Sequence, residues 1–109
     1  MIKEVYYKDK TFHVQFLSGI KKYKGLMFSR KLKNNQGIML VNNHEAILSI
    51  HMLFVFFPIK IVWINSNKEI VDIKTAYPFQ LLISSIKKAR YILELNNNSN
   101  LNLGDKLKF

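Results

Sequence analysis

The stretch SIHMLFVFFPIKIVWIN, residues Ser49 to Asn65, is the most apolar part of the chain and decides its fold. Only fourteen uncharged residues lie between Glu45 and Lys60, whereas a helix that crosses a bilayer needs about 20 apolar residues. The residues around and after Pro58 are mainly β-branched or aromatic, which favours strands. Since proline lacks an amide donor and disfavours a helix before it, we expect a buried strand on each side of Pro58 rather than a membrane span.

The flanking sequence has the same pattern of short strands and turns. Val5 to Leu17 carries two aromatic runs around Lys8-Asp9-Lys10 and predicts a hairpin. A second hairpin is predicted from Ile61 to Ile73, with its turn at Ser66 to Lys68. Further strands are expected at GIMLV (37–41), RYILEL (90–95) and KLKF (106–109).

The exception is SGIKKYKGLMF, residues 18–28, which predicts a short helix. Ser18 can accept the amide hydrogen bonds of a helix start, and apolar residues from Ile20 to Met27 recur at helical spacing. Gly25 costs a helix about 1 kcal/mol relative to alanine, so a looser turn remains an alternative. Six or more short strands with one or two short helices predict a mainly β (α+β) fold, a small and mostly antiparallel β-barrel.

Length and composition limit the protein class. The 109 residues suit a single domain, residues 1–109. There is no cysteine, which excludes disulfides, thiolate metal sites and cysteine nucleophiles and fits a reducing cytoplasm. Glu4 and Asp9 interrupt any apolar region at the N-terminus, so we expect no secretory signal and a soluble, cytoplasmic protein.

The net charge of +10 suggests an anionic partner such as nucleic acid or a lipid surface. The chain is also rich in Lys, Asn and Ile, and a low-GC coding bias would supply these residues without selection for binding. The charge therefore leaves both explanations open.

A basic run is the clearest surface for nucleic acid. Such a run can bind phosphates, and aromatic side chains within it can stack on bases. Its members are Lys21, Lys22, Tyr23, Lys24, Arg30, Lys31 and Lys33. The alternative is a solvated helix whose apolar residues, Tyr23, Leu26 and Met27, pack on the barrel.

Five blocks in order, GLMFSRKL (25–32), GIML (37–40), FPIKIVWIN (57–65), ARYILEL (89–95) and LGDKLKF (103–109), resemble the family called domain of unknown function 192. The resemblance implies a compact, β-rich, barrel-like fold without an established activity. It carries over to Gly25, Leu26, Met27, Arg30, Gly37, Pro58, Arg90, Glu94, Gly104 and Asp105. Two departures weaken any shared polar site: Lys60 stands where the family has aspartate, and residues 51–55 replace a Trp-Met-Lys-Asn-Thr segment.

Few residues suggest a catalytic or ligand-binding role. Arg90 and Glu94 are four apart in a predicted strand and share one face, so they could bind and activate a small anion together with Arg30 and His51, or they could form structural ion pairs. His51 could be a ligand or base, or a hydrogen-bonded core histidine.

We expect no metal and no cofactor, because His13, His44 and His51 lack a metal-type spacing. Asp105, after Gly104, is expected to accept backbone hydrogen bonds in the last turn. Phosphate loops, carboxylate dyads and Ser-His-Asp patterns are absent from the sequence. The sequence thus favours a non-enzymatic binding module with an unknown ligand; nucleic-acid binding and a small-anion site or enzyme are the alternatives, and the oligomeric state is open.

Overall fold

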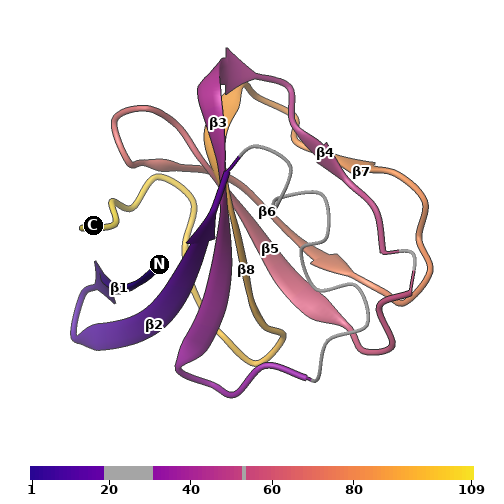
Figure 1. Ribbon diagram of the computed structural model, residues 1–109. Coiled ribbons are helices and arrows are strands. Elements are labelled where there is room, and N and C mark those ends of the chain that lie inside the picture. The colour runs from indigo at the N-terminus through magenta and orange to yellow at the C-terminus, as the bar shows by residue number, and fades with distance from the viewer. Residues whose placement is uncertain (19–30, 53) are drawn as a thin grey trace.

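The computed structural model of the chain describes residues 1–18, 31–52 and 54–109. Eight strands run through these residues (Figure 1): β1 Ile2–Tyr7, β2 Lys10–Leu17, β3 Gln36–Ala46, β4 Ser49–Ile50, β5 Ile59–Ile64, β6 Ile70–Ala76, β7 Ile83–Ser84 and β8 Ala89–Asn96. The prediction of a mainly β protein with six or more strands is therefore confirmed.

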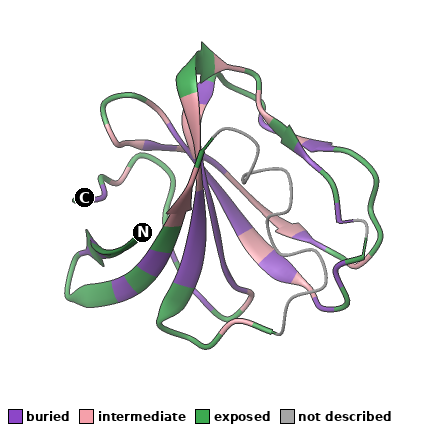
Figure 2. Cartoon of the chain, in the orientation of Figure 1, coloured by how far each residue is buried: buried purple, intermediate pink, exposed green. Residues whose placement is uncertain are grey.

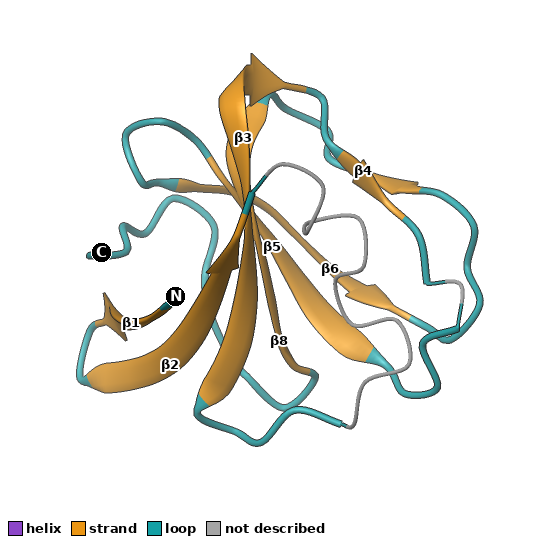
Figure 3. Ribbon diagram, in the orientation of Figure 1, coloured by secondary structure: helices purple, strands orange, loops and turns teal. Residues whose placement is uncertain are grey.

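Six strands form one sheet in the order β1-β2-β3-β8-β5-β6. Four of its ladders are antiparallel, and the β2–β3 ladder is parallel. The two-residue strands β4 and β7 pair with each other in a separate antiparallel ribbon, which lies beside the large sheet (Figure 3). The sheet is thus mostly antiparallel, as predicted.

Both predicted hairpins are confirmed. β1 and β2 pair around Lys8 and Asp9, and Lys8 takes a positive φ of 54° in this turn. β5 and β6 pair around residues 65–69, where the Asn65 side-chain oxygen accepts hydrogen bonds from the amides of Asn67 and Glu69. An asparagine that bonds amides a few residues further on is a common way to fix a tight turn, so the local sequence explains this hairpin.

The prediction of a closed barrel is wrong, because the sheet is open. Its edge strands β1 and β6 do not pair with each other. The C-terminal segment lies between them, with isolated bridges from Lys108 to Tyr6 of β1 and from Lys106 to Glu69, the residue before β6. Within this segment Leu107 also donates its amide to the Lys68 carbonyl. Since successive residues of the segment bond to opposite edges, KLKF forms single bridges and not the predicted strand.

The apolar stretch differs from its prediction on the side before Pro58. β5 begins directly after Pro58, as expected, but only Ser49–Ile50 is strand before it. Val55 instead donates its amide to the Met52 carbonyl in a turn, while its side chain is buried. An irregular segment can therefore bury the apolar side chains that the sequence assigned to a strand.

Helices are absent from residues 1–18, 31–52 and 54–109. The helix predicted over residues 18–28 lies, apart from Ser18, outside the described residues. Within the described ranges no helix has the length and apolar character needed to cross a bilayer.

β3, β5 and β8 each contain a run of consecutive buried residues (Figure 2). Because consecutive side chains of a strand point to opposite faces, both faces of the sheet are buried. One face carries Trp63 and Ile92, and residues of the β4–β7 ribbon pack in the same core cluster. The other face carries Val62 and Leu93, which cluster with residues of β1, β2 and the C-terminal segment. This two-sided burial holds the strand ends in fixed positions.

Candidate functional site

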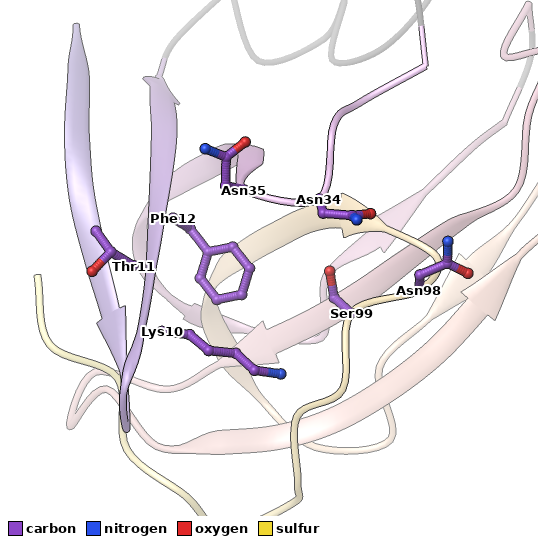
Figure 4. A pocket seen from close by; sticks show the side chains of 7 residues that line it. All are labelled: Lys10, Thr11, Phe12, Asn34, Asn35, Asn98 and Ser99. Carbon is purple, nitrogen blue, oxygen red and sulfur yellow. The ribbon is translucent and has the colours of Figure 1, made fainter.

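A pocket lies where three segments meet at one end of the sheet (Figure 4). Its volume is about 360 Å³. The segments are the start of β2, the turn before β3 and the turn after β8. The lining residues are Lys10, Thr11, Phe12, Asn34, Asn35, Asn98 and Ser99.

Sheet topology brings these three segments together. β2 and β3 are parallel, so both begin at the same end of the sheet, and β8 is antiparallel to β3, so it ends there. Two hydrogen bonds fix the turn before β3: His13 donates its amide to the Asn35 carbonyl at 2.7 Å, and Asn96 donates its side-chain amide to the Leu32 carbonyl at 2.7 Å. One backbone bond from β2 and one side-chain bond from β8 therefore hold this border of the pocket.

The turn after β8 is fixed in a similar way. The Asn96 side-chain oxygen accepts a hydrogen bond from the Asn98 amide at 2.8 Å, and its backbone carbonyl accepts one from the Ser99 amide at 2.9 Å. Asn96 thus bonds both turns that border the pocket. Its side chain is a positioning element, while those of Asn98 and Ser99 line the cavity.

The lining combines one aromatic ring with several polar groups. Phe12 is 3% exposed and forms an apolar wall. In Figure 4 the Phe12 ring and the Lys10 side chain both extend from β2 toward the turn that carries Ser99. The amides and hydroxyls can donate and accept hydrogen bonds, and the lysine ammonium supplies positive charge. The lining thus offers both an apolar wall and polar groups that can orient a ligand.

Sequence reasoning missed all seven lining residues. The only signal was the asparagine-rich character of the two turns, NN at 34–35 and NNNSN at 96–100. Asparagine is common in turns for purely local reasons, so this signal does not indicate a pocket by itself. The asparagine-rich turns indicate a pocket only once the sheet topology has placed both of them beside the start of β2.

Among the described residues of the sheet, Glu94 has the pKa that departs most from its usual value. It lies in β8 between Ile38 of β3 and Ile61 of β5, and it is only 4% exposed. In the described part of the chain its carboxylate makes no ion pair. Burial in these surroundings raises the pKa of Glu94 to about 7. Near neutral pH the carboxyl can therefore hold or release a proton.

Arg90 lies in β8 on the same side as Glu94, two positions before Ile92, as the alternation predicts. Its Nε donates a hydrogen bond to the Asn42 carbonyl at 3.2 Å. Its guanidinium also lies 5.5 Å from the centroid of the Tyr91 ring. The backbones of Arg90 and Glu94 are about 13 Å apart at about 3.3 Å per residue. Among the ion pairs of the described residues none joins these two side chains.

The other predicted site residues are dispersed or not described. His51 is exposed just after β4, and Pro58 immediately precedes β5. Lys31 and Lys33 are exposed and lead into the turn of the pocket. Lys21, Lys22, Tyr23, Lys24, Gly25, Leu26, Met27 and Arg30 lie outside the described residues. Within residues 1–18, 31–52 and 54–109 no group of three His, Asp or Glu side chains could hold a metal ion.

Gly104 and Asp105 fasten the C-terminal segment to both edges of the sheet: Gly104 donates its amide to the Ile70 carbonyl of β6 at 2.9 Å, and the Asp105 side chain contacts Tyr7 of β1. Gly104 has a φ of 86°, which glycine adopts without strain. The Asp105 carboxylate accepts a hydrogen bond from the Tyr7 hydroxyl at 2.6 Å and pairs with Lys8 at 3.4 Å, so its partners are side chains where backbone amides were expected. The Tyr7 hydrogen bond, with help from Lys8, lowers the pKa of Asp105. These contacts are structural.

The fold and the pocket define a small protein with a mostly antiparallel six-stranded sheet and a cavity of mixed apolar and polar lining at the sheet end. The model of the family called domain of unknown function 192, described as Uncharacterized ACR, matches residues 7–109, and the chain belongs to this family. The resemblance found in the sequence blocks is thereby confirmed.

Relatives and solved structures agree with this assignment. A UPF0127 protein of Thermococcus kodakarensis is 33% identical over 69% of this chain, which spans 47% of that relative's length, about half. A UPF0127 protein of Pyrococcus furiosus is 30% identical over 94% of this chain and 90% of its own length.

Two crystal structures have a similar fold. A protein of unknown function from Novosphingobium aromaticivorans superposes with a TM-score of 0.90 at 19% identity, covering 99% of this chain and 85% of its own. A candidate transcription regulator from Sinorhizobium meliloti superposes with a TM-score of 0.87 at 21% identity, covering 96% of this chain and 89% of its own. At these identities the likeness concerns the fold alone.

Proposed function

We propose that the chain is a small-molecule-binding module whose ligand is a hydroxylated molecule with one anionic group, held in the pocket at the sheet end. The observation that carries the proposal is the convergence of amide, hydroxyl and ammonium groups from three segments around the buried ring of Phe12. Ligand pockets commonly combine an apolar wall with a few polar groups that orient the ligand.

The size of the cavity sets the size of the ligand. Its volume of about 360 Å³ is near the lower end of the range for small-molecule sites. A single sugar unit with a phosphate or carboxylate fits this scale, and a longer oligomer would extend into solvent. The ring of Phe12 can pack against the carbon face of a sugar, while the asparagine amides bond its hydroxyls.

Charge supports an anionic group on the ligand. Lys10 lines the pocket, and exposed Lys31 and Lys33 lie next to the turn that borders it. With a net charge of +10 the protein also attracts anions from a distance. We propose that the module acts in the cytoplasm as one domain, which fits the lack of cysteine.

A small-anion site that uses Arg30, His51, Arg90 and Glu94 is the second candidate. The placement of Arg90 and Glu94 on one side of β8 supports it. The raised pKa of Glu94 also lets this buried carboxyl hold a proton near neutral pH. Nucleic-acid binding through the basic run is a further proposal, and the exposure of Lys31 and Lys33 is compatible with it.

The proposal is tested by calorimetric titration with glucose, glucuronate and glucose 6-phosphate at low salt. We expect binding of at least one anionic sugar with a Kd of about 1 mM or better, and weaker binding of glucose. Lys10→Gln should weaken anionic-sugar binding about tenfold or more, the effect of losing one hydrogen bond to a charged group.

Lys106→Gln is the matched control, since Lys106 is an exposed lysine outside the pocket, and it should leave binding unchanged. No binding of any of the three sugars, or equal losses in the two variants, would contradict the proposal. Displacement of the sugar by a mixed oligonucleotide would favour the nucleic-acid reading.

A further inference from the structure

A second surface, distinct from the pocket, is formed by exposed apolar side chains at both ends of the β4–β7 ribbon. We call it the apolar rim. Its members are Ile47, Phe54, Phe56, Tyr77, Phe79, Leu81, Leu82 and Ile86, each between 40% and 76% exposed. They are eight of the twelve large hydrophobic residues that are exposed in the described part of the chain. Such a concentration on one surface marks an interaction site.

Two segments that are distant in sequence run together at the rim (Figure 1). Met52 donates its amide to the Gln80 carbonyl at 2.6 Å, and its own carbonyl accepts the Phe79 amide at 2.9 Å. The rings of Phe56 and Phe79 meet edge to face, with centroids 5.4 Å apart. The ladder between Ile50 and Ile83 continues this pairing toward Ile86.

The rim rests on a fixed base. Met52, Val55 and Ile83 are buried beneath it, so the same segments point apolar side chains both into the core and into solvent. Phe54 and Phe79 have positive φ angles of 58° and 66°. Bulky residues rarely adopt this conformation, and strain of this kind is retained at binding sites more often than elsewhere.

The exposed charge that follows Ile86 is positive. The Asp72 carboxylate, which accepts the Ile86 amide, is buried and pairs with Lys74. The Glu45 carboxylate accepts the Ser66 amide. The sequence contains no Asp or Glu in residues 46–58 or 77–93. Lys87 and Lys88 are exposed immediately after Ile86, and His51 is exposed beside β4. The rim therefore combines aliphatic and aromatic tips with adjacent cations, the combination that binds the interface of an anionic bilayer.

We propose that the apolar rim docks on an anionic lipid surface, with Leu81 and Leu82 entering the interface and Lys87 and Lys88 contacting headgroups. A symmetric contact with a second copy fits less well. It would place Lys87 and Lys88 of both copies in one interface between proteins that each carry a net charge of +10. This docking is peripheral, and it is independent of the ligand pocket.

The test is co-sedimentation of the full chain with vesicles of phosphatidylcholine alone or of equal parts phosphatidylcholine and phosphatidylglycerol. We expect binding to the phosphatidylglycerol vesicles only, released by high salt. Lys87→Gln with Lys88→Gln should weaken binding about thirtyfold, and Leu81→Ser with Leu82→Ser should abolish it. Leu103→Ser is the control, because Leu103 is 63% exposed but lies outside the rim.

Folding of each variant is checked by the fluorescence of Trp63, which is fully buried. Failure of the folded wild type to bind either vesicle would overturn the proposal, as would rim variants that bind as well as Leu103→Ser. Light scattering of the protein without vesicles measures its oligomeric state. A dimer that Leu81→Ser with Leu82→Ser converts to a monomer would assign the rim to a second copy instead of a bilayer.

Discussion

Replacing Glu94 by glutamine should stabilise the protein at alkaline pH, although it removes a residue from the centre of the sheet. Burial raises the pKa of Glu94 from its usual 4.5 to about 7. The native state therefore holds a proton that the unfolded state releases between these two values. The contribution of Glu94 to the free energy of unfolding is therefore fully present below pH 4.5 and is lost as the pH rises through about 7.

The size of this effect follows from the shift in the pKa. Each unit of difference corresponds to about 1.4 kcal/mol, so the ionised carboxyl costs the folded state about 3 kcal/mol above pH 7. Glutamine has nearly the same shape and no charge. Glu94→Gln should therefore be more stable than the wild type by about 3 kcal/mol at pH 8 and about equally stable at pH 4.

Urea unfolding followed by Trp63 fluorescence measures this difference across the pH range. Glu45→Gln serves as the control, because Glu45 is exposed and should show no comparable gain at pH 8. A Glu94→Gln variant that is less stable than the wild type at pH 8 would refute the reasoning. It would mean that the Glu94 carboxylate has a cationic partner or a strong hydrogen bond in the folded protein.

Two further substitutions test the packing that holds the sheet ends. Gly37→Ala should lower the free energy of unfolding, measured in urea, by about 1–3 kcal/mol. A Cβ at Gly37 would lie 2.8 Å from the Leu95 side chain and 3.0 Å from the Glu94 carbonyl oxygen. Unchanged stability would show that β3 and β8 can move apart at this position. Tyr7→Phe should raise the pKa of Asp105 toward its usual value in an NMR titration, since the Tyr7 hydrogen bond is the main cause of its lowering; an unmoved pKa would assign the lowering to Lys8.

Much of the strand content could be predicted from the sequence because it depends on local patterns. The hairpins around Lys8 and Ser66 combine β-formers with turn residues, and both are observed. The prediction of a closed barrel was wrong because closure depends on the last residues of the chain. Their backbone bonds alternate between Tyr6 on one side and Lys68 and Glu69 on the other. No local pattern in KLKF distinguishes such a segment from an edge strand.

The site was less predictable than the fold. The alternation along β8 placed Arg90 and Glu94 on one side, but it could not show that Glu94 is buried between Ile38 and Ile61, because that depends on which strands flank β8. The pocket depends on the parallel pairing of β2 with β3, which brings the Asn34–Asn35 turn next to Lys10. Parallel neighbours are joined by long connections, and short-range patterns carry no information about them.

The measurement that tests the pocket most directly is a map of backbone amide shifts during titration with glucose 6-phosphate. If the ligand binds at the sheet end, saturable shifts should concentrate at residues 10–12, 34–35 and 98–99, and Lys10→Gln should reduce them. Saturable shifts centred on Arg90 and Glu94, or shifts that stay linear in sugar concentration at every residue, would contradict the assignment of the pocket as the binding site.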